Sequence, residues 1–212
     1  ILQAADLDVG AILTGDAVAA VRAHRMFDEA ALTMSPVPLA GSTEVVSFQY
    51  APGREVVTAP PGAWRSISGL SPNRPSLQAQ AEWLAADIAA GLPLVYAATS
   101  EQFIPQMLNV DLIDGVSFTK GCYAGQEIVA RTHHLGRVKR RTMRFHLPAG
   151  GAAPALLAHL LLDGVKAAEV LMTAGTGDGI ELLAVTNLDA AGKALQLEDG
   201  RIAEPRALPY SF

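Results

Sequence analysis

The chain has 212 residues, of which 50% are hydrophobic and only 17% charged, so it can bury a core and is not expected to be disordered. No apolar run approaches the roughly 18 residues that a membrane span needs, and the net charge of −5 argues against general affinity for nucleic acids. Its single cysteine, Cys122, excludes an internal disulfide framework, cannot hold an iron–sulfur cluster alone and favours a location in the reducing cytoplasm.

The N-terminal part of the chain alternates between strand and helix patterns. We expect a strand, a helix, a hairpin and a second helix over residues 6–13, 17–32, 43–50 with 54–58, and 76–90. The hairpin would turn at Ala51-Pro52-Gly53, and Gly91-Leu92-Pro93 would end the second helix. This order favours an α+β layer, with helices against one face of a sheet.

Irregular and β patterns fill the rest of the chain. Residues 94–121 lack periodicity, and long irregular stretches inside compact domains are usually functional. A short helix and five short strands follow, over residues 125–132, 142–147, 159–162, 165–172, 180–186 and 194–197. Hairpin turns at Asp163-Gly164 and Asp199-Gly200 favour a small barrel or sandwich. We therefore expect an α+β domain over residues 1–138 and a C-terminal β-barrel domain over residues 139–212.

Residues 120–127, with the sequence Lys-Gly-Cys-Tyr-Ala-Gly-Gln-Glu, combine several reactive groups. Lys120 and a helix start just after Cys122 would both favour the thiolate form, which makes Cys122 a candidate functional thiol and Lys120 its activator. The alternative for a lone cysteine is a small buried side chain. Gln126 and Glu127 offer an amide and a carboxylate that can form hydrogen bonds with the donors and acceptors of a heterocyclic ring. The alternative for Glu127 is that its charge only stabilises the N-terminal end of a helix. The residues alone indicate a site for an anion or a heterocycle.

Residues 120–144 form a basic stretch with a local charge of +6, because Glu127 is its only acid. The basic residues are Lys120, Arg131, Arg137, Lys139, Arg140, Arg141 and Arg144. A basic surface on an acidic chain favours a specific anionic partner, and the alternative is a solvated strand edge. The adjacent His133 and His134 have no partners at the spacing of metal ligands, so we expect a surface pair and no metal site.

Several motifs together resemble the YgfZ family of folate-binding proteins. They are Phe103-Ile104-Pro105-Gln106, Asn109, residues 115–131, Gly136-Arg137-Val138-Lys139-Arg140-Arg141 and the ending Leu208-Pro209-Tyr210-Ser211. The resemblance is strongest between Trp83 and Arg141, and the chain matches the later part of a family member, without its N-terminal portion. It implies an aminomethyltransferase-like fold, related to the T-protein of the glycine-cleavage system, with tetrahydrofolate or a folate derivative as cofactor.

The resemblance also implies roles for individual residues. Cys122 and Lys120 correspond to the cysteine and lysine of the family motif, and Trp83 to its folate-contacting tryptophan. The other residues expected to bind the cofactor are Tyr123, Gln126, Glu127, Arg131 and Arg137, with the basic side chains meeting the glutamate tail of folate. Relatives carry a glutamate at the position of Ala89, so another carboxylate would have to take its place. The candidates are Glu82, Asp87 and Glu101.

The resemblance implies a tetrahydrofolate-binding accessory protein, rather than an enzyme, that supports iron–sulfur cluster assembly or repair and thereby tRNA modification. Its expected partners are folate and iron–sulfur client proteins in the cytoplasm, with no metal cluster of its own, no membrane and no direct RNA contact. A folate-dependent aminomethyltransferase is the first alternative, which Ala89 disfavours. An RNA-binding module in residues 131–144 is the second, with only Phe145 near enough to stack on bases. A cysteine hydrolase with His134 as base is the third, without an identifiable orienting group.

Overall fold

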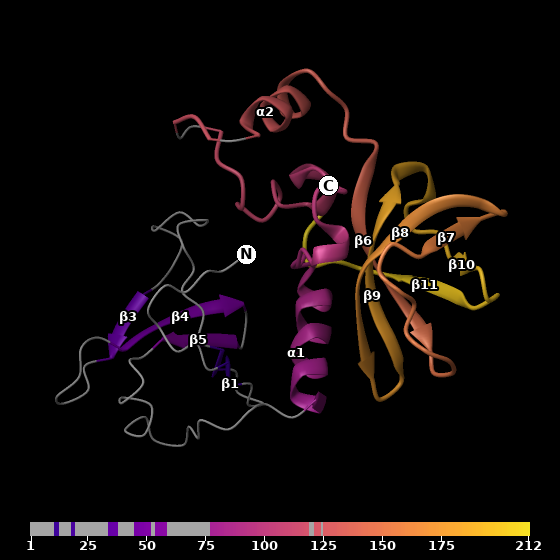
Figure 1. The fold of residues 1–212 in the computed structure, drawn as a ribbon, viewed down its shortest axis with the longest axis horizontal. Helices are drawn as coiled ribbons and strands as arrows, with labels where there is room; N and C mark the ends of the chain where they lie inside the picture. The colour runs from indigo at the N-terminus through magenta and orange to yellow at the C-terminus, as the bar shows by residue number, and fades with distance from the viewer. Residues whose placement is uncertain are drawn as a thin grey trace. The chain divides into compact units, whose positions relative to one another are not determined.

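The computed structural model describes residues 11–12, 18–19, 34–37, 45–51, 54–58, 77–118, 121–123 and 125–212 (Figure 1). The chain divides into two compact units, Ile1–Gln80 and Ala81–Phe212. Among the described helices, none combines the length and the apolar character that a bilayer crossing requires. All the site residues expected from the sequence belong to the second unit.

In its described residues, the first unit contains a five-stranded sheet in the order β1-β2-β5-β4-β3. Its strands are β1 Ala11–Ile12, β2 Val18–Ala19, β3 Met34–Val37, β4 Val45–Ala51 and β5 Arg54–Thr58. The predicted hairpin is confirmed, because β4 pairs antiparallel with β5 and places Phe48 opposite Val56. The predicted helix over residues 17–32 is wrong at Val18 and Ala19, where pairing with β1 and β5 outweighs the local helical spacing. The other residues of that helix lie outside the described ones.

Helix α1 (Leu77–Ala90) confirms the helix predicted over residues 76–90. Alanine, leucine and glutamine, which are strong helix formers, dominate its sequence. Gly91 ends the helix in the left-handed conformation, with φ at 68°. The N–H of Gly91 donates to the C=O of Ile88 at 3.0 Å, and the N–H of Leu92 donates to the C=O of Asp87 at 2.9 Å. These two bonds satisfy terminal carbonyl groups of the helix, as in a Schellman motif.

The second unit contains a closed barrel with the strand order β10-β11-β6-β9-β8-β7 (Figure 1). Its strands are β6 Arg140–Pro148, β7 His159–Leu162, β8 Val165–Thr176, β9 Gly179–Asn187, β10 Leu195–Leu197 and β11 Ile202–Arg206. The five predicted strands are confirmed, and they form a barrel and not a sandwich. The sequence does not predict β11, because Pro205 lacks an N–H group and argues against a strand. In the barrel, Pro205 lies opposite Phe145 of β6.

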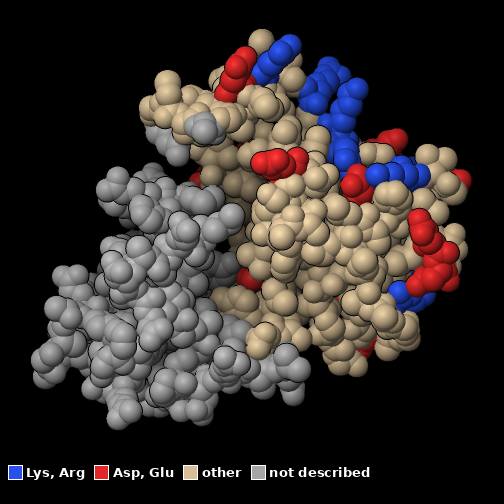
Figure 2. All heavy atoms as spheres, viewed as in Figure 1, with Lys and Arg blue, Asp and Glu red and all other residues tan. Residues whose placement is uncertain are grey.

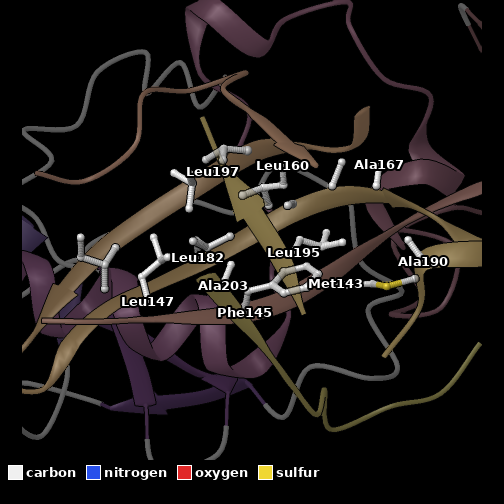
Figure 3. Packing of buried hydrophobic residues seen from close by; sticks show 14 residues of the cluster. Met143, Phe145, Leu147, Leu160, Ala167, Leu182, Ala190, Leu195, Leu197 and Ala203 are labelled. Atoms are coloured by element: carbon white, nitrogen blue, oxygen red, sulfur yellow. The ribbon is translucent and has the colours of Figure 1, made fainter. Parts of the chain in front are cut away.

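The barrel interior holds the main hydrophobic core (Figure 3). Side chains alternate between the two faces of a strand, so Met143, Phe145 and Leu147 of β6 all point inward, where they meet Leu182 of β9. Phe145, Leu147 and Leu182 are fully buried. The predicted turn at Asp163-Gly164 is confirmed between β7 and β8. Its two φ angles, 51° and 77°, suit a two-residue hairpin of type I′.

A second hydrophobic cluster lies on the outer wall of the barrel. There Ile88 of α1 packs with Leu171 of β8 and Leu183 of β9, and partly buried side chains of residues 94–110 join them. These contacts fix α1 and the irregular stretch to the barrel, which gives the candidate site a rigid support. The first barrel strand begins at Arg140, next to the domain boundary expected between residues 138 and 139. The division into domains over residues 1–138 and 139–212 stays a prediction.

Candidate functional site

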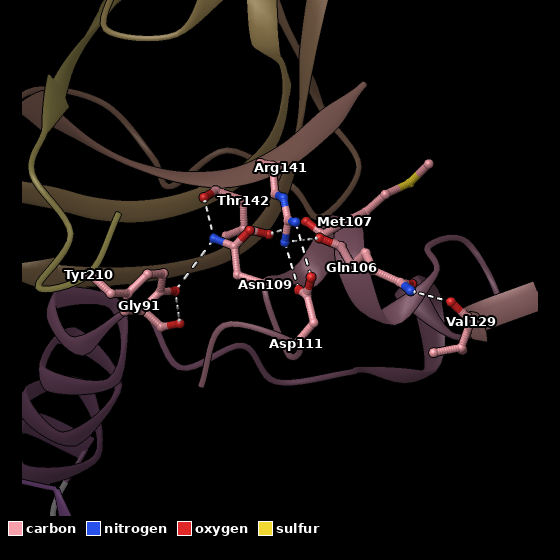
Figure 4. A network of polar contacts seen from close by, with 9 residues as sticks. All are labelled: Gly91, Gln106, Met107, Asn109, Asp111, Val129, Arg141, Thr142 and Tyr210. Atoms are coloured by element: carbon pink, nitrogen blue, oxygen red, sulfur yellow. Dashed lines mark hydrogen bonds and ion pairs between the residues drawn. The ribbon is translucent and has the colours of Figure 1, made fainter. Parts of the chain in front are cut away.

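Polar side chains hold the irregular stretch that precedes Cys122 (Figure 4). The helical elements of this region are η2 (Ala97–Thr99), η3 (Pro105–Leu108) and α2 (Gln126–His134). Buried Gln106 donates through Nε2 to the C=O of Val129 in α2 at 2.7 Å. Buried Asn109 donates through Nδ2 to the C=O of Thr142 in β6 at 2.8 Å. The two side chains therefore tie the stretch to α2 and to the barrel.

Arg141 and Asp111 form an ion pair within the same network (Figure 4). Arg141 donates to both carboxylate oxygens of Asp111, from Nη1 to Oδ1 at 2.6 Å and from Nη2 to Oδ2 at 3.0 Å. Its Nη1 also donates to the C=O of Gln106 at 2.9 Å. The two charged side chains are only 11% and 10% exposed. A bidentate pair fixes geometry as well as charge, so the irregular stretch has one defined position against β6.

Tyr210 joins this network from the C-terminal end of the chain. Its Oη donates to the C=O of Gly91 at 2.7 Å, and Nδ2 of Asn109 donates to the same Oη at 3.4 Å. Burial raises the pKa of Tyr210, which keeps the phenol protonated and able to donate. Gln106, Asn109 and Tyr210, which belong to the motifs of the family resemblance, thus serve as a scaffold for the site.

The residues after Cys122 lead into α2, which confirms the predicted short helix. Gly125 is its N-cap, in the left-handed conformation with φ at 84°. The N–H of Tyr123 donates to Oε1 of Gln126 at 3.3 Å. The amide oxygen that is expected to bind a ligand therefore also accepts a hydrogen bond from the neighbouring backbone. Cys122 is exposed with a free thiol, which removes the alternative of a buried side chain. Glu127 is exposed as well.

Three of the seven basic side chains in residues 120–144 are neutralised by ion pairs. The pairs are Arg140–Glu169, Arg141–Asp111 and Arg144–Glu181, with N–O distances of 2.8, 2.6 and 2.7 Å. Arg131, Arg137 and Lys139 are exposed and form no ion pair with another described residue, and Lys120 lies outside the described residues. Lysine and arginine side chains gather where α2 leads into β6 (Figure 2). The local charge of +6 therefore overstates the positive charge that a ligand would meet.

Phe145 does not support the RNA-binding alternative. Its side chain is fully buried inside the barrel, so it cannot stack on a base. The pairing of Arg140, Arg141 and Arg144 also removes charges that could contact phosphates. Both observations weaken the argument for a nucleic-acid site in residues 131–144.

Trp83 lies on α1, half-buried, and a buried carboxylate follows it by one helical turn. Asp87 is 1% exposed, whereas the other two candidate carboxylates, Glu82 and Glu101, are exposed. At 100° per residue, Asp87 lies about 40° around the helix axis from Trp83, and Ala89 lies about 120° away. Asp87 is therefore the candidate carboxylate that is both buried and on the same side of α1 as Trp83.

Asp87 also acts electrostatically on Tyr96. Burial raises the pKa of Tyr96, and the charge of Asp87 raises it further. The raised pKa keeps the Tyr96 phenol protonated at neutral pH.

Phe118 belongs to the candidate site, and it lies within the motif of residues 115–131, although the sequence assigns it no role of its own. Its ring contacts His133 and His134, which are exposed and adjacent as expected. No three His, Cys, Asp or Glu side chains within the described ranges are grouped so that they could hold a metal ion. An aromatic residue in an irregular stretch gives no periodic signal, so this contact emerges only from the fold.

Comparison with known proteins gives a consistent set of relatives, although no protein-family model matches the chain. The tRNA-modifying protein YgfZ of Yersinia pseudotuberculosis is 34% identical over 197 residues, which cover 88% of this chain and 59% of the relative. The protein of the same name from Yersinia pestis strain Pestoides F gives the same identity and coverage. That of Cronobacter sakazakii is 41% identical over 106 residues, or 50% of this chain and 32% of the relative. The chain thus spans less than two thirds of the length of these relatives.

Proposed function

Because the chain belongs to the YgfZ family over the part of its relatives that it spans, we propose that it is a tetrahydrofolate-binding accessory protein. It would support the assembly or repair of iron–sulfur clusters in cytoplasmic client proteins, and thereby the modification of tRNA. The relatives' name, tRNA-modifying protein, supports the last part of this function. Since the chain covers 59% of the first relatives, the activity and clients of the whole protein belong to the proposal.

The proposal includes an aminomethyltransferase-like fold. The closed barrel at the C-terminal end of the chain supports it. The sheet of the first unit and helix α1 support an α+β character for the residues that precede the barrel. A comparison of each unit with a solved aminomethyltransferase would test this part of the proposal.

The buried carboxylate beside Trp83 is the observation that carries the folate proposal. The ring system of a reduced folate presents an amino group next to a ring N–H, and a carboxylate can accept both hydrogen bonds at once. Asp87 supplies such a carboxylate, and Trp83 supplies a flat aromatic surface for the ring. A carboxylate has about four lone-pair sites, so Asp87 can accept hydrogen bonds from a ligand in addition to protein groups, provided that the ligand displaces the groups that leave Asp87 only 1% exposed. Asp87 would thus take the role that relatives give to a glutamate at the position of Ala89.

The residues around α2 would meet the remainder of the ligand and the clients. Arg131 and Arg137 are exposed, and their guanidinium groups suit the carboxylates of a glutamate tail. Lys120, Tyr123, Gln126 and Glu127 complete the set of proposed contacts. The exposed free thiol of Cys122 would act in redox or persulfide chemistry or in contact with a client protein, with Lys120 as its activator.

Replacing Asp87 with asparagine tests which carboxylate reads the folate ring. Loss of a charged hydrogen-bond acceptor costs about 1.5–3 kcal/mol of binding free energy. We therefore expect Asp87→Asn to weaken tetrahydrofolate binding by about 10- to 100-fold, as measured by isothermal titration calorimetry. Thermal unfolding of the variant would establish that it still folds.

Glu82→Gln is the matched control, because Glu82 is an exposed carboxylate on the same helix. We expect this variant to bind tetrahydrofolate with unchanged affinity. Equal losses in the two variants, or a folded Asp87→Asn protein with full affinity, would count against Asp87 as the ring-binding carboxylate.

A further inference from the structure

A ring stack ties the segment that bears Cys122 to the C-terminal end of α2. The ring of Phe118 lies almost parallel to that of His133, with centroids 3.9 Å apart and an interplanar angle of 21°. The ring of His134 stands edge-on to His133, with centroids 4.8 Å apart. Phe118 is four residues before Cys122, so the stack holds the chain on the N-terminal side of the thiol.

A second anchor holds the chain at the other end of α2. The N–H of Tyr123 donates to Oε1 of Gln126 at 3.3 Å, and the N–H of Gln126 donates to the C=O of Tyr123 at 3.2 Å. Gln126 and His133 lie seven residues apart on the helix, which separates the anchors by about 10 Å. The five residue steps from Phe118 to Tyr123 reach at most about 17 Å. The two anchors therefore limit how far Cys122, which lies immediately before the second one, can move away from α2.

Two glycines close to Cys122, Gly121 and Gly125, have open space beside their backbone. A Cβ atom added to Gly121 or to Gly125 would meet no other atom within 4 Å, so the backbone on both sides borders open space. Cys122 itself is exposed. The contacts at the two ends of the segment therefore bear on the position of the thiol.

We propose that Phe118 and His133 form a clasp, a pair of positioning residues that holds Cys122 at the N-terminal end of α2. The inference rests on the proposed role of Cys122 as a functional thiol. A thiol that must meet a client or a second sulfur atom needs a defined place, because small displacements of a reacting group are costly. Opening the clasp would free the Cys122 segment while leaving the barrel core and the polar network intact.

A spin label tests the clasp directly, because Cys122 is the single cysteine of the chain. We would attach a nitroxide to Cys122 and compare electron paramagnetic resonance spectra. In the unaltered protein we expect a restricted label. Phe118→Leu and His133→Ala should give the sharp lines of a segment moving on the nanosecond timescale. Phe118→Tyr and His133→Phe preserve a ring stack and should restore the restricted spectrum.

Leu135→Ala is the matched control, because Leu135 is an exposed residue at the same end of α2. It should leave the spectrum unchanged. A restricted label in both Phe118→Leu and His133→Ala overturns the clasp. Because His133 is exposed, His133→Ala keeps the test decisive if Phe118→Leu fails to fold.

Complementation then separates the clasp from the proposed function. In a strain that lacks the protein, Phe118→Leu should lose activity as Cys122→Ser does, and Phe118→Tyr should retain it. The label spectra do not depend on folate, so failure of folate binding would remove the proposed cofactor and leave the clasp standing. The label could be mobile in Phe118→Leu while Cys122→Ser complements the strain fully. In that case Cys122 would have no functional role, and the clasp would have no thiol to position for function.

Discussion

Asp111→Ala is expected to lower the free energy of unfolding of the second unit by about 3 kcal/mol or more. The substitution leaves the Arg141 guanidinium in a place where its side chain is only 11% exposed. Removing one partner of a buried ion pair typically costs 3–5 kcal/mol, because the remaining charge is neither solvated nor paired. Arg141 keeps its bond to the C=O of Gln106, which limits the loss. Urea denaturation followed by circular dichroism measures the change.

Asp199→Ala provides the control for this prediction. Asp199 pairs with Arg201 across an exposed turn, where water solvates either charge after the other is removed. The denaturation midpoint of this variant should stay close to that of the unaltered protein. If Asp111→Ala shifted the midpoint no more than Asp199→Ala, the Arg141–Asp111 pair would not be a main support of the irregular stretch.

Gly91→Ala is expected to destabilise the second unit by about 2–3 kcal/mol. A non-glycine residue in the left-handed conformation costs roughly 1–2 kcal/mol, and φ at Gly91 is 68°. The added Cβ would also lie 2.5 Å from Oη of Tyr210 and 2.8 Å from its ring. Tyr210 would have to move, which removes its hydrogen bond to the C=O of Gly91 at a further cost of about 1 kcal/mol. Thermal and urea denaturation measure the total.

Gly164→Ala separates the two contributions. Gly164 has a similar φ of 77°, but a Cβ atom there would meet nothing within 4 Å. This variant should show only the conformational cost of roughly 1–2 kcal/mol. Tyr210→Phe should show only the loss of the hydrogen bonds of Oη, of which the short one to Gly91 contributes about 1 kcal/mol. If Gly91→Ala and Gly164→Ala were equally destabilised, the contact between Gly91 and Tyr210 would contribute nothing to stability.

Local signals in the sequence account for much of the described fold. The hairpin pattern over residues 43–50 and 54–58, the Asp163-Gly164 turn and the glycine that ends α1 each predict the structure found there. The helix expected at residues 17–32 fails at β2, since strand pairing is a non-local effect that a single-segment pattern does not contain. Strand β11 is not predicted either, because Pro205 argues against a strand in the local sequence. Its pairing with β6, which is again a non-local effect, makes this segment a strand.

The candidate site was less accessible from sequence, because its main contacts join distant residues. The segment around Cys122 and the helix after it follow from local composition. The partners that neutralise Arg140, Arg141 and Arg144 lie about 30 residues or more away along the chain, so the basic stretch looked more highly charged than it is. Helical spacing alone predicts that Asp87, and not Ala89, lies on the same side of the helix as Trp83. Only the structure establishes that Asp87 is buried.

Titration of the purified chain with tetrahydrofolate tests the central claim most directly. We expect saturable quenching of tryptophan fluorescence, with Trp83 as the responding residue. Calorimetry on Trp83→Ala, which lacks that fluorophore, should show that binding is lost. Absence of saturable binding, both in this chain and in a longer version that spans the full length of its relatives, would contradict the proposal that this protein binds folate.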